Sequence, residues 1–333
     1  MEIKQRLEYI DAAKAIAIVL VIVGHCYWLG AIPRLGNLIY SFHMPLFFVV
    51  SGFFLKQLSI KDALSKYSKA YLWPYLVIGI FITIIGISKS LANHDSWCSL
   101  ISLNLTKIAW GSNYESDILF GNIPHIGPSW FLLALFWGCV LYTVILKIKS
   151  RLQQVILLFL GVSYSLCSAK IMKMPLSFQG GVICVMYLYI GSYIVNERIL
   201  NDVFSIPKFL WMLAALLWLM VAVFVPGMDI GSASLGFSLV GFSVSLIGTF
   251  SILAICKRFR LKFNWIGRNT LNILCAHILL WRILDIFGYS SKNLSYCPQV
   301  NFLIEATYEI LGAFLLAWII SKLHILEFKK IFK

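Results

Sequence analysis

The chain has 333 residues, of which 60% are hydrophobic and only 13% are charged, and its formal net charge is +14. Soluble domains carry about 45–50% apolar and about 25% charged residues. This composition, with a mean hydropathy of +0.85, therefore excludes a soluble enzyme, a disordered chain and a disulfide scaffold. It predicts a polytopic membrane protein, with the lipid bilayer as one of its partners.

Apolar runs of roughly 20 residues, long enough to cross about 30 Å of hydrocarbon as a helix, recur along the chain. Because backbone hydrogen bonds must be satisfied inside lipid, each run is predicted to be helical. The predicted spans are 11–30, 38–56, 71–90, 129–147, 152–169, 179–196, 208–225, 233–255, 266–287 and 303–321. We expect an all-α fold, a bundle of about ten transmembrane helices forming a single domain over 1–333, with no appended soluble domain.

Basic residues indicate the topology. About three quarters of the 28 lysines and arginines fall in segments that are cytoplasmic if the N-terminus is inside. Since cytoplasmic loops collect basic residues, both termini are predicted to be cytoplasmic. The same bias accounts for the positive net charge, so we expect no nucleic-acid partner. The longest connection, 91–128, lies on the outer side and has the length of a functional loop.

Ionisable residues inside a span are costly and by default mark a functional site. Asp11 and Lys14 are three residues apart at the inner end of the first span, so they can pair. Lys14 and His25 are eleven residues apart, which puts them on one helical face about 16 Å apart along the axis. His43 has a depth in the second span similar to that of His25. The two histidines can therefore face one cavity.

Further ionisable residues follow in the last two spans. His277 is near the middle of the ninth span, Arg282 and Asp285 are at its end, and Glu305 and Glu309 are four residues apart on the tenth. The favoured interpretation of the last four is an ion-pair network at the outer interface, and a catalytic role is the alternative.

Cysteines do not indicate a metal site, because no Cys/His cluster has metal-ligand spacing. Cys98 and Cys297 fall in outer connections, where a disulfide would persist in an oxidising compartment. Either these two cysteines pair across the outer mouth of the bundle, or both are free thiols.

Five segments resemble the membrane acyltransferase 3 family, whose members O-acylate sugars on bacterial envelope glycans. The resemblance covers nearly the whole chain and fits the stand-alone form, without an extracytoplasmic hydrolase domain. Lysines replace arginines that are common in relatives, and Asn272 to Cys275 replace frequent aromatic residues. The segments are Tyr9 to Lys14 with Ile22 to His25, Phe42 to Phe53, the basic loop before Pro74 with Lys66 and Lys69, Trp130 to Leu132, and Gly267 to His277.

The resemblance implies an integral membrane O-acyltransferase of the bacterial inner membrane. It would move an acetyl or other short acyl group from cytoplasmic acyl-CoA to a hydroxyl of an envelope or exported glycan. Acetyl-CoA is a donor substrate, and no permanently bound cofactor is expected. The implied roles are catalysis for His25 and His43, donor binding for Lys14, Asp11, Lys66 and Lys69, and acceptor-side or structural roles for Trp130, His277, Arg282, Glu305 and Glu309.

His25 would act as a general base on the acceptor hydroxyl, because imidazole titrates near neutral pH. Direct transfer is preferred, and a transient acyl-histidine is the alternative. A transporter or flippase that uses intramembrane histidines and acids as a proton relay is the rival class. The lack of paired Gly/Pro-broken helices in two corresponding halves counts against it. A purely structural scaffold leaves the shared face of Lys14 and His25 unexplained.

Overall fold

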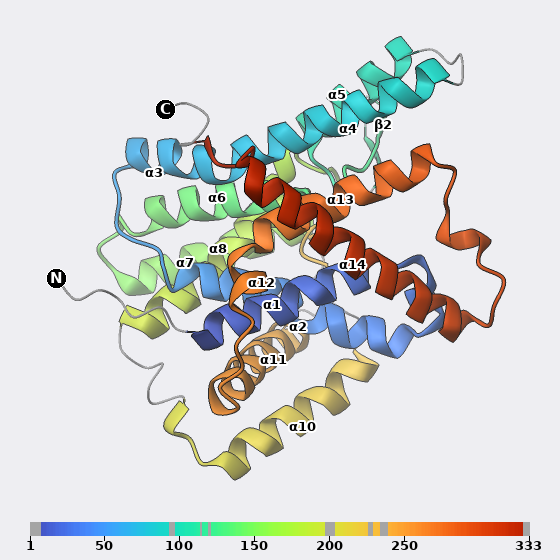
Figure 1. The fold of residues 1–333 in the computed structure, drawn as a ribbon. Coiled ribbons are helices and arrows are strands. Elements are labelled where there is room, and N and C mark those ends of the chain that lie inside the picture. The colour runs from blue at the N-terminus through green and yellow to red at the C-terminus, as the bar shows by residue number, and fades with distance from the viewer. Residues whose placement is uncertain are drawn as a thin grey trace.

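The fold is known from a computed structural model that describes residues 8–92, 97–113, 115–118, 121–196, 204–225, 229–233 and 239–328. Within these ranges each predicted span overlaps one long helix, which confirms the all-α prediction (Figure 1). The long helices are α1 (Glu8–Gly24), α2 (Pro33–Gly52), α4 (Trp73–Ala92), α6 (Trp130–Ile145), α7 (Arg151–Ser168), α8 (Phe178–Asn196), α10 (Lys208–Phe224), α11 (Leu239–Arg258), α13 (Thr270–Ile286) and α14 (Pro298–Leu323).

The bundle is that of a multi-pass membrane protein. In the described part of the chain, six helical segments are long and apolar enough to cross a bilayer, and they include α2, α4, α7, α8, α11 and α14. The remaining four long helices, α1, α6, α10 and α13, have 16 or 17 residues. A helix of that length rises about 25 Å. The start of α1 and the end of α14 lie toward the same side of the bundle (Figure 1), as an even number of crossings requires.

Short elements connect the long helices. The connection 91–128, predicted to lie on the outer side, contains a helix and a hairpin that the hydropathy pattern does not predict, and α5 packs back along α4. The 14 residues of α5 are too few for this helix to cross the hydrocarbon. The short elements are η1 (Tyr27–Ala31), α3 (Ile60–Tyr67), the π-helical turn η2 (Ser68–Leu72), α5 (Trp97–Trp110), β1 (Ser116–Ile118), β2 (Gly121–Ile123), η3 (Pro175–Ser177), α12 (Asn264–Arg268) and η4 (Ser291–Asn293).

Cys98 and Cys297 are both free and exposed, so the structure contains no bridge between them. Cys98 is in α5, which lies along α4, whereas Cys297 precedes the first residue of α14. These two elements project to different corners of the bundle (Figure 1).

Helix α2 is the centre of the bundle and contacts α1, α8, α10 and α11. Its closest neighbour is α8, because glycines face each other's backbone at the crossing. A Cβ atom on Gly191 would lie 2.0 Å from the carbonyl oxygen of Val49, and one on Gly52 would lie 2.3 Å from that of Leu188. Small residues allow this approach, which is the main source of packing between helices in lipid.

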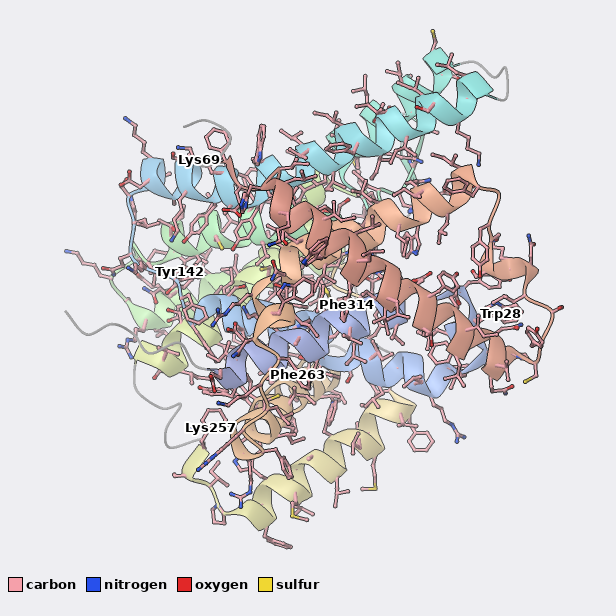
Figure 2. All side chains as sticks on the ribbon, viewed as in Figure 1. Trp28, Lys69, Tyr142, Lys257, Phe263 and Phe314 are labelled. Atoms are coloured by element: carbon pink, nitrogen blue, oxygen red, sulfur yellow. The ribbon has the colours of Figure 1, made fainter. Side chains whose placement is uncertain are left out.

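The outer surface of the bundle is apolar, as lipid requires. Figure 2 shows side chains filling the space between the helices and projecting from the peripheral ones. Phe159 of α7, Met212 of α10 and Leu311 of α14 are all exposed. A helix that is apolar on every face is the pattern of a membrane span.

We expect Gly191→Ala to lower the stability of the protein by about 1–3 kcal/mol, because the added methyl group overlaps the backbone of α2. The matched control is Gly30→Ala, since a Cβ atom there meets nothing within 4 Å. Thermal unfolding in detergent measures both variants. Equal melting temperatures for the two variants would contradict the close crossing of α2 and α8.

Candidate functional site

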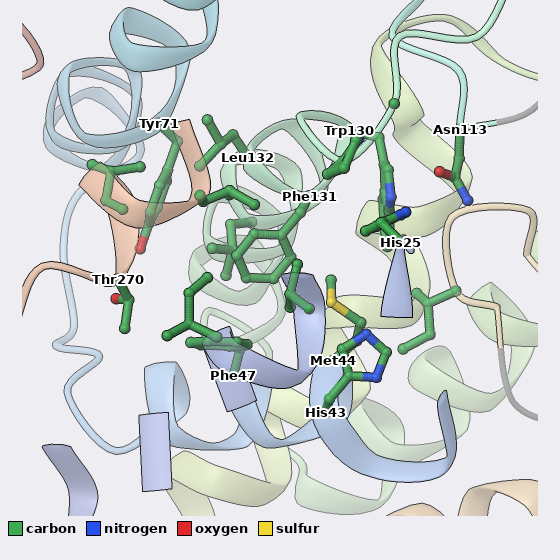
Figure 3. A pocket seen from close by; sticks show the side chains of 18 of the residues that line it. His25, His43, Met44, Phe47, Tyr71, Asn113, Trp130, Phe131, Leu132 and Thr270 are labelled. Carbon is green, nitrogen blue, oxygen red and sulfur yellow. The ribbon is translucent and has the colours of Figure 1, made fainter. Parts of the chain in front are cut away.

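One cavity of about 730 Å³ lies inside the bundle. One end, called the inner end after the predicted topology, is lined by Lys14, Tyr71 and Thr270, and the opposite or outer end by Asn113 and Asp229. Figure 3 shows Tyr71 and Thr270 toward one end and Asn113 toward the other. The cavity therefore extends from the end of the bundle that carries the start of α1 to the loops around Asn113 and Asp229.

His25 lines this cavity at the point where the first helix ends. The predicted span 11–30 is too long, because α1 stops at Gly24. The reason lies in α14, where the buried Glu305 carboxylate accepts hydrogen bonds from the backbone N–H groups of Tyr27 and Trp28, both at 2.9 Å. These amides therefore have acceptors although α1 does not continue. The chain turns at His25 and enters η1.

His43 lines the same cavity from α2, as predicted. Its Nδ1 atom lies 2.7 Å from the carbonyl oxygen of Ile39. A carbonyl can only accept, so Nδ1 carries a proton, and Nε2 of the neutral ring is left as an acceptor. The neighbouring Tyr40 packs edge-on against His43 and donates its hydroxyl proton to the Gly24 carbonyl at 2.7 Å. Tyr40 thus ties α2 to the end of α1.

Behind His25 lies a buried polar cluster that the sequence pattern did not predict. Nε2 of His277 is 3.2 Å from one oxygen of Glu309, and the indole N–H of Trp281 donates to the other oxygen at 3.0 Å. The Trp281 ring lies edge-on to His25, with 5.7 Å between centroids, and contacts His277 at 4.3 Å. Glu309 therefore holds the aromatic wall against which His25 rests.

The predicted ion-pair network at the outer interface is wrong. Among the described residues no ion pair joins Arg282 to Glu305 or Glu309. The two glutamates are buried and are already satisfied by backbone amides, His277 and Trp281. Asp285 pairs instead with Lys89 of α4 at 2.7 Å. Arg282 lines a separate small cavity between α4 and α5.

The inner end of the cavity is charged. Nζ of Lys14 lies 3.0 Å from the buried carboxylate of Asp11, which is the predicted pair. Arg268, which the sequence reasoning missed, brings its Nε atom to 3.9 Å from the same carboxylate. A Cβ atom on Gly267 would lie 2.1 Å from the Asp11 carbonyl oxygen. The sequence feature that could have indicated this contact is Gly267 directly before Arg268, because a glycine permits close approach of another backbone.

Lys66 and Lys69 do not line the cavity. Both are exposed, and their ammonium groups lie over the rings of Tyr67 and Phe328 at 5.1 and 5.3 Å. The η2 turn contributes Tyr71 to the cavity instead. Trp130 lines the cavity from the first turn of α6 (Figure 3).

The described ranges contain no three His, Cys, Asp or Glu side chains close enough together to hold a metal ion. The site combines the imidazoles of His25 and His43 on the cavity wall, a charged inner end, and an apolar stretch of lining between them, with His125 in the lining near Asn113 and Asp229.

Residues 7–322 match the model of the acyltransferase domain of the acyltransferase 3 family. The chain belongs to this family. No curated protein and no solved structure matches it. The matched region runs from the segment before α1 to the last turn of α14, so the whole cavity lies within the acyltransferase domain.

In this membrane acyltransferase we expect Glu309→Ala to cost about 1–3 kcal/mol of stability for each buried donor that it leaves unsatisfied. It leaves His277 and the Trp281 N–H without an acceptor. The variant Glu309→Gln retains a carbonyl oxygen as an acceptor and should lose less stability. The control is Glu327→Ala, since Glu327 is an exposed acid that pairs with His324 at the surface. Thermal unfolding in detergent gives the order of stabilities, and equal values for the Ala and Gln variants would contradict this role.

Proposed function

We propose that this protein is a bacterial inner-membrane O-acyltransferase. It moves an acetyl or other short acyl group from cytoplasmic acyl-CoA to a hydroxyl of an envelope or exported glycan. The observation that carries this proposal is the cavity, which connects the end with Lys14 to the loops with Asn113 and Asp229 and has the imidazoles of His25 and His43 on its wall. Family membership supports acyl transfer as the reaction class.

The donor would enter from the inner end. Lys14 and His25 are about 16 Å apart along the helix axis, and an extended pantetheine arm is comparable in length to half a bilayer. With its phosphates held by Lys14 and Arg268, the thioester would reach His25. Cationic donors with fixed geometry are the usual ligands of phosphate. Asp11, 3.0 Å from Lys14, orients the ammonium group.

Lys66 and Lys69 would act outside the cavity in this scheme. They belong to α3 and η2, and η2 also supplies Tyr71 to the inner lining. We assign them to the nucleotide part of the donor, which stays at the membrane surface while the pantetheine arm enters.

His25 is the general base in this mechanism because its hydrogen bonds are uncommitted. His43 donates from Nδ1 to Ile39, and His277 is bound to Glu309. His25 has no hydrogen-bond partner in the described part of the chain. Its ring is part-exposed to the cavity, where the acceptor hydroxyl would be its hydrogen-bond partner.

The transfer step follows from this assignment. His25 takes the proton of the acceptor hydroxyl while the oxygen attacks the thioester carbonyl carbon. A C–O bond forms, the C–S bond breaks, and the thiolate of CoA leaves. The imidazolium returns its proton to that thiolate, so the products are the ester and the free thiol. Nε2 of His43 faces the same space as a second hydrogen-bonding group.

A transporter is the second candidate, because a cavity that reaches both ends of the bundle also suits translocation. Incubating the purified protein with radiolabelled acetyl-CoA separates the two functions. Release of labelled acetate or label in a glycan is expected only of the acyltransferase. Movement of a glycan across vesicles without any label transfer would favour the transporter.

We expect His25→Ala to lower acyl transfer by about 10²–10⁴-fold, which is the usual contribution of a general base. His324→Ala is the matched control, since His324 is exposed near the end of α14. The measurement is label transfer per folded molecule, with folding checked by thermal unfolding. Activity of the His25 variant within a few-fold of the unmodified protein would exclude His25 as the base.

We also expect Lys14→Ala to raise the KM for acetyl-CoA more than Lys14→Arg does, because arginine keeps the charge and binds phosphate. Lys61→Ala serves as the control for general inner-face charge, since Lys61 is exposed on α3. Lys66→Ala should have a smaller effect than Lys14→Ala, because Lys66 lies outside the cavity lining. Equal loss in the Ala and Arg variants of Lys14 would point to packing against Asp11 instead.

A further inference from the structure

The outer end of the cavity has a fixed carboxylate. Oδ1 of Asp229 accepts hydrogen bonds from Nδ2 of Asn113 at 3.1 Å and from the backbone N–H of Ser232 at 3.2 Å. Its other oxygen, Oδ2, has no hydrogen-bond partner among the described residues. Both Asp229 and Asn113 line the cavity. One carboxylate oxygen is thus held by two donors while the other can accept from a molecule in the cavity.

Contacts between two loops hold the part of the cavity wall that carries Asp229. A Cβ atom on Gly231 would lie 2.6 Å from Nδ2 of Asn113, so the two loops are in direct contact. Nζ of Lys173 donates to the Ser232 carbonyl at 2.5 Å, which fixes the segment from the other side. A site whose groups are already fixed loses little entropy when a ligand binds.

The charged side chains in the lining at this end are acidic, and the cations closest to it lie behind the lining. Glu115 and Asp229 line the cavity there, whereas Lys14, the cationic side chain in the lining, is at the inner end. Burial and the nearby charge of Lys107 lower the pKa of His125, so this lining imidazole is neutral at pH 7.

The other cations near the outer end are outside the lining. Lys107 and Arg282 line the separate small cavity beside α5. Lys173 is engaged with the Ser232 carbonyl. A ligand at the outer end of the main cavity therefore meets carboxylates and aromatic rings without a lining lysine or arginine.

We propose that this outer end is an acceptor subsite for an uncharged or amino-bearing pyranoside, with Oδ2 of Asp229 accepting a hydrogen bond from a sugar hydroxyl, and that it discriminates against sugars carrying a carboxylate. The inference rests on the proposed function and specifies its acceptor. Ionised carboxylates form strong hydrogen bonds with hydroxyl donors. The rings of Trp130 and Trp281, which also line the cavity, provide apolar surface for the faces of a sugar ring.

Discrimination follows from the cost of burying an unpaired charge. A carboxylate entering this space would lose its hydration without gaining a cationic partner. It would also lie against Asp229, and like charges in contact are strongly unfavourable. An amino group would instead be attracted to the same wall.

The test compares sugars that differ at one group. The full-length protein in detergent is supplied with labelled acetyl-CoA and with methyl glucoside, methyl glucuronide or methyl glucosaminide. Glucoside and glucuronide differ only in having a hydroxymethyl group or a carboxylate at C5. We expect kcat/KM for the glucoside to exceed that for the glucuronide by about tenfold or more. The glucosaminide should be used at least as well as the glucoside.

The variant Asp229→Asn keeps a side-chain oxygen for Asn113 and Ser232 but removes the charge. We expect it to reduce the glucoside-to-glucuronide ratio to within about threefold. Glu115→Gln should reduce the ratio by a smaller factor, because Glu115 is exposed. Asp62→Asn, an exposed acid on α3 at the other end of the bundle, should leave the ratio unchanged. The ratio is independent of changes in the donor step, since both sugars share it.

Three results would overturn the inference. They are equal use of glucoside and glucuronide by the unmodified protein, an unchanged ratio in Asp229→Asn, and hydrolysis of acetyl-CoA with no acetylation of any neutral or amino sugar at tens of millimolar. Failure of the proposed function has a different signature, because acetyl-CoA would then be neither hydrolysed nor used with any acceptor, and the inference would fall with it.

Discussion

The site depends on two hydrogen bonds that Glu305 accepts from the backbone at Tyr27 and Trp28. In lipid, a helix that stops short leaves amide groups without partners, which is costly. Glu305 removes this cost by accepting hydrogen bonds from two of the freed amides. Helix α1 can therefore end inside the bundle and not at its surface. His25 is the residue that this ending brings to the cavity wall. The carboxylate on the last helix thus fixes the position of an imidazole on the first.

A second carboxylate on the same helix extends the arrangement. Glu309, one turn further along α14, anchors His277 and Trp281, and the Trp281 ring lies against His25. The two glutamates act on different parts of the turn at His25. Glu305 accepts hydrogen bonds from the backbone that follows His25, and Glu309 accepts one from Trp281, whose ring packs on the His25 side chain. Neither glutamate lines the cavity. Their role is positioning, which explains why buried acids are retained so close to the proposed chemistry.

Sequence reasoning predicted what periodicity and spacing determine. The apolar runs gave the long helices, the i,i+3 spacing gave the pair of Asp11 and Lys14, and similar depth brought His25 and His43 to one cavity. It failed where the outcome depends on contacts between distant segments. The end of α1 at Gly24 is set by Glu305, 281 positions later in the chain. Arg268 and Asp229 enter the site through close approaches at glycines, which hydropathy does not register.

The apolar middle of the cavity has a further consequence. Between Lys14 and the histidines the lining includes Phe47, Phe131 and Leu132, which lie between Thr270 and His43 in Figure 3. A hydrophobic constriction resists wetting and blocks ions even where it is wide enough for apolar groups. In the proposed mechanism this apolar stretch of lining would accept the acyl thioester while opposing the passage of ions. Acyl transfer through such a lining would then not require a water-filled path for protons across the bundle.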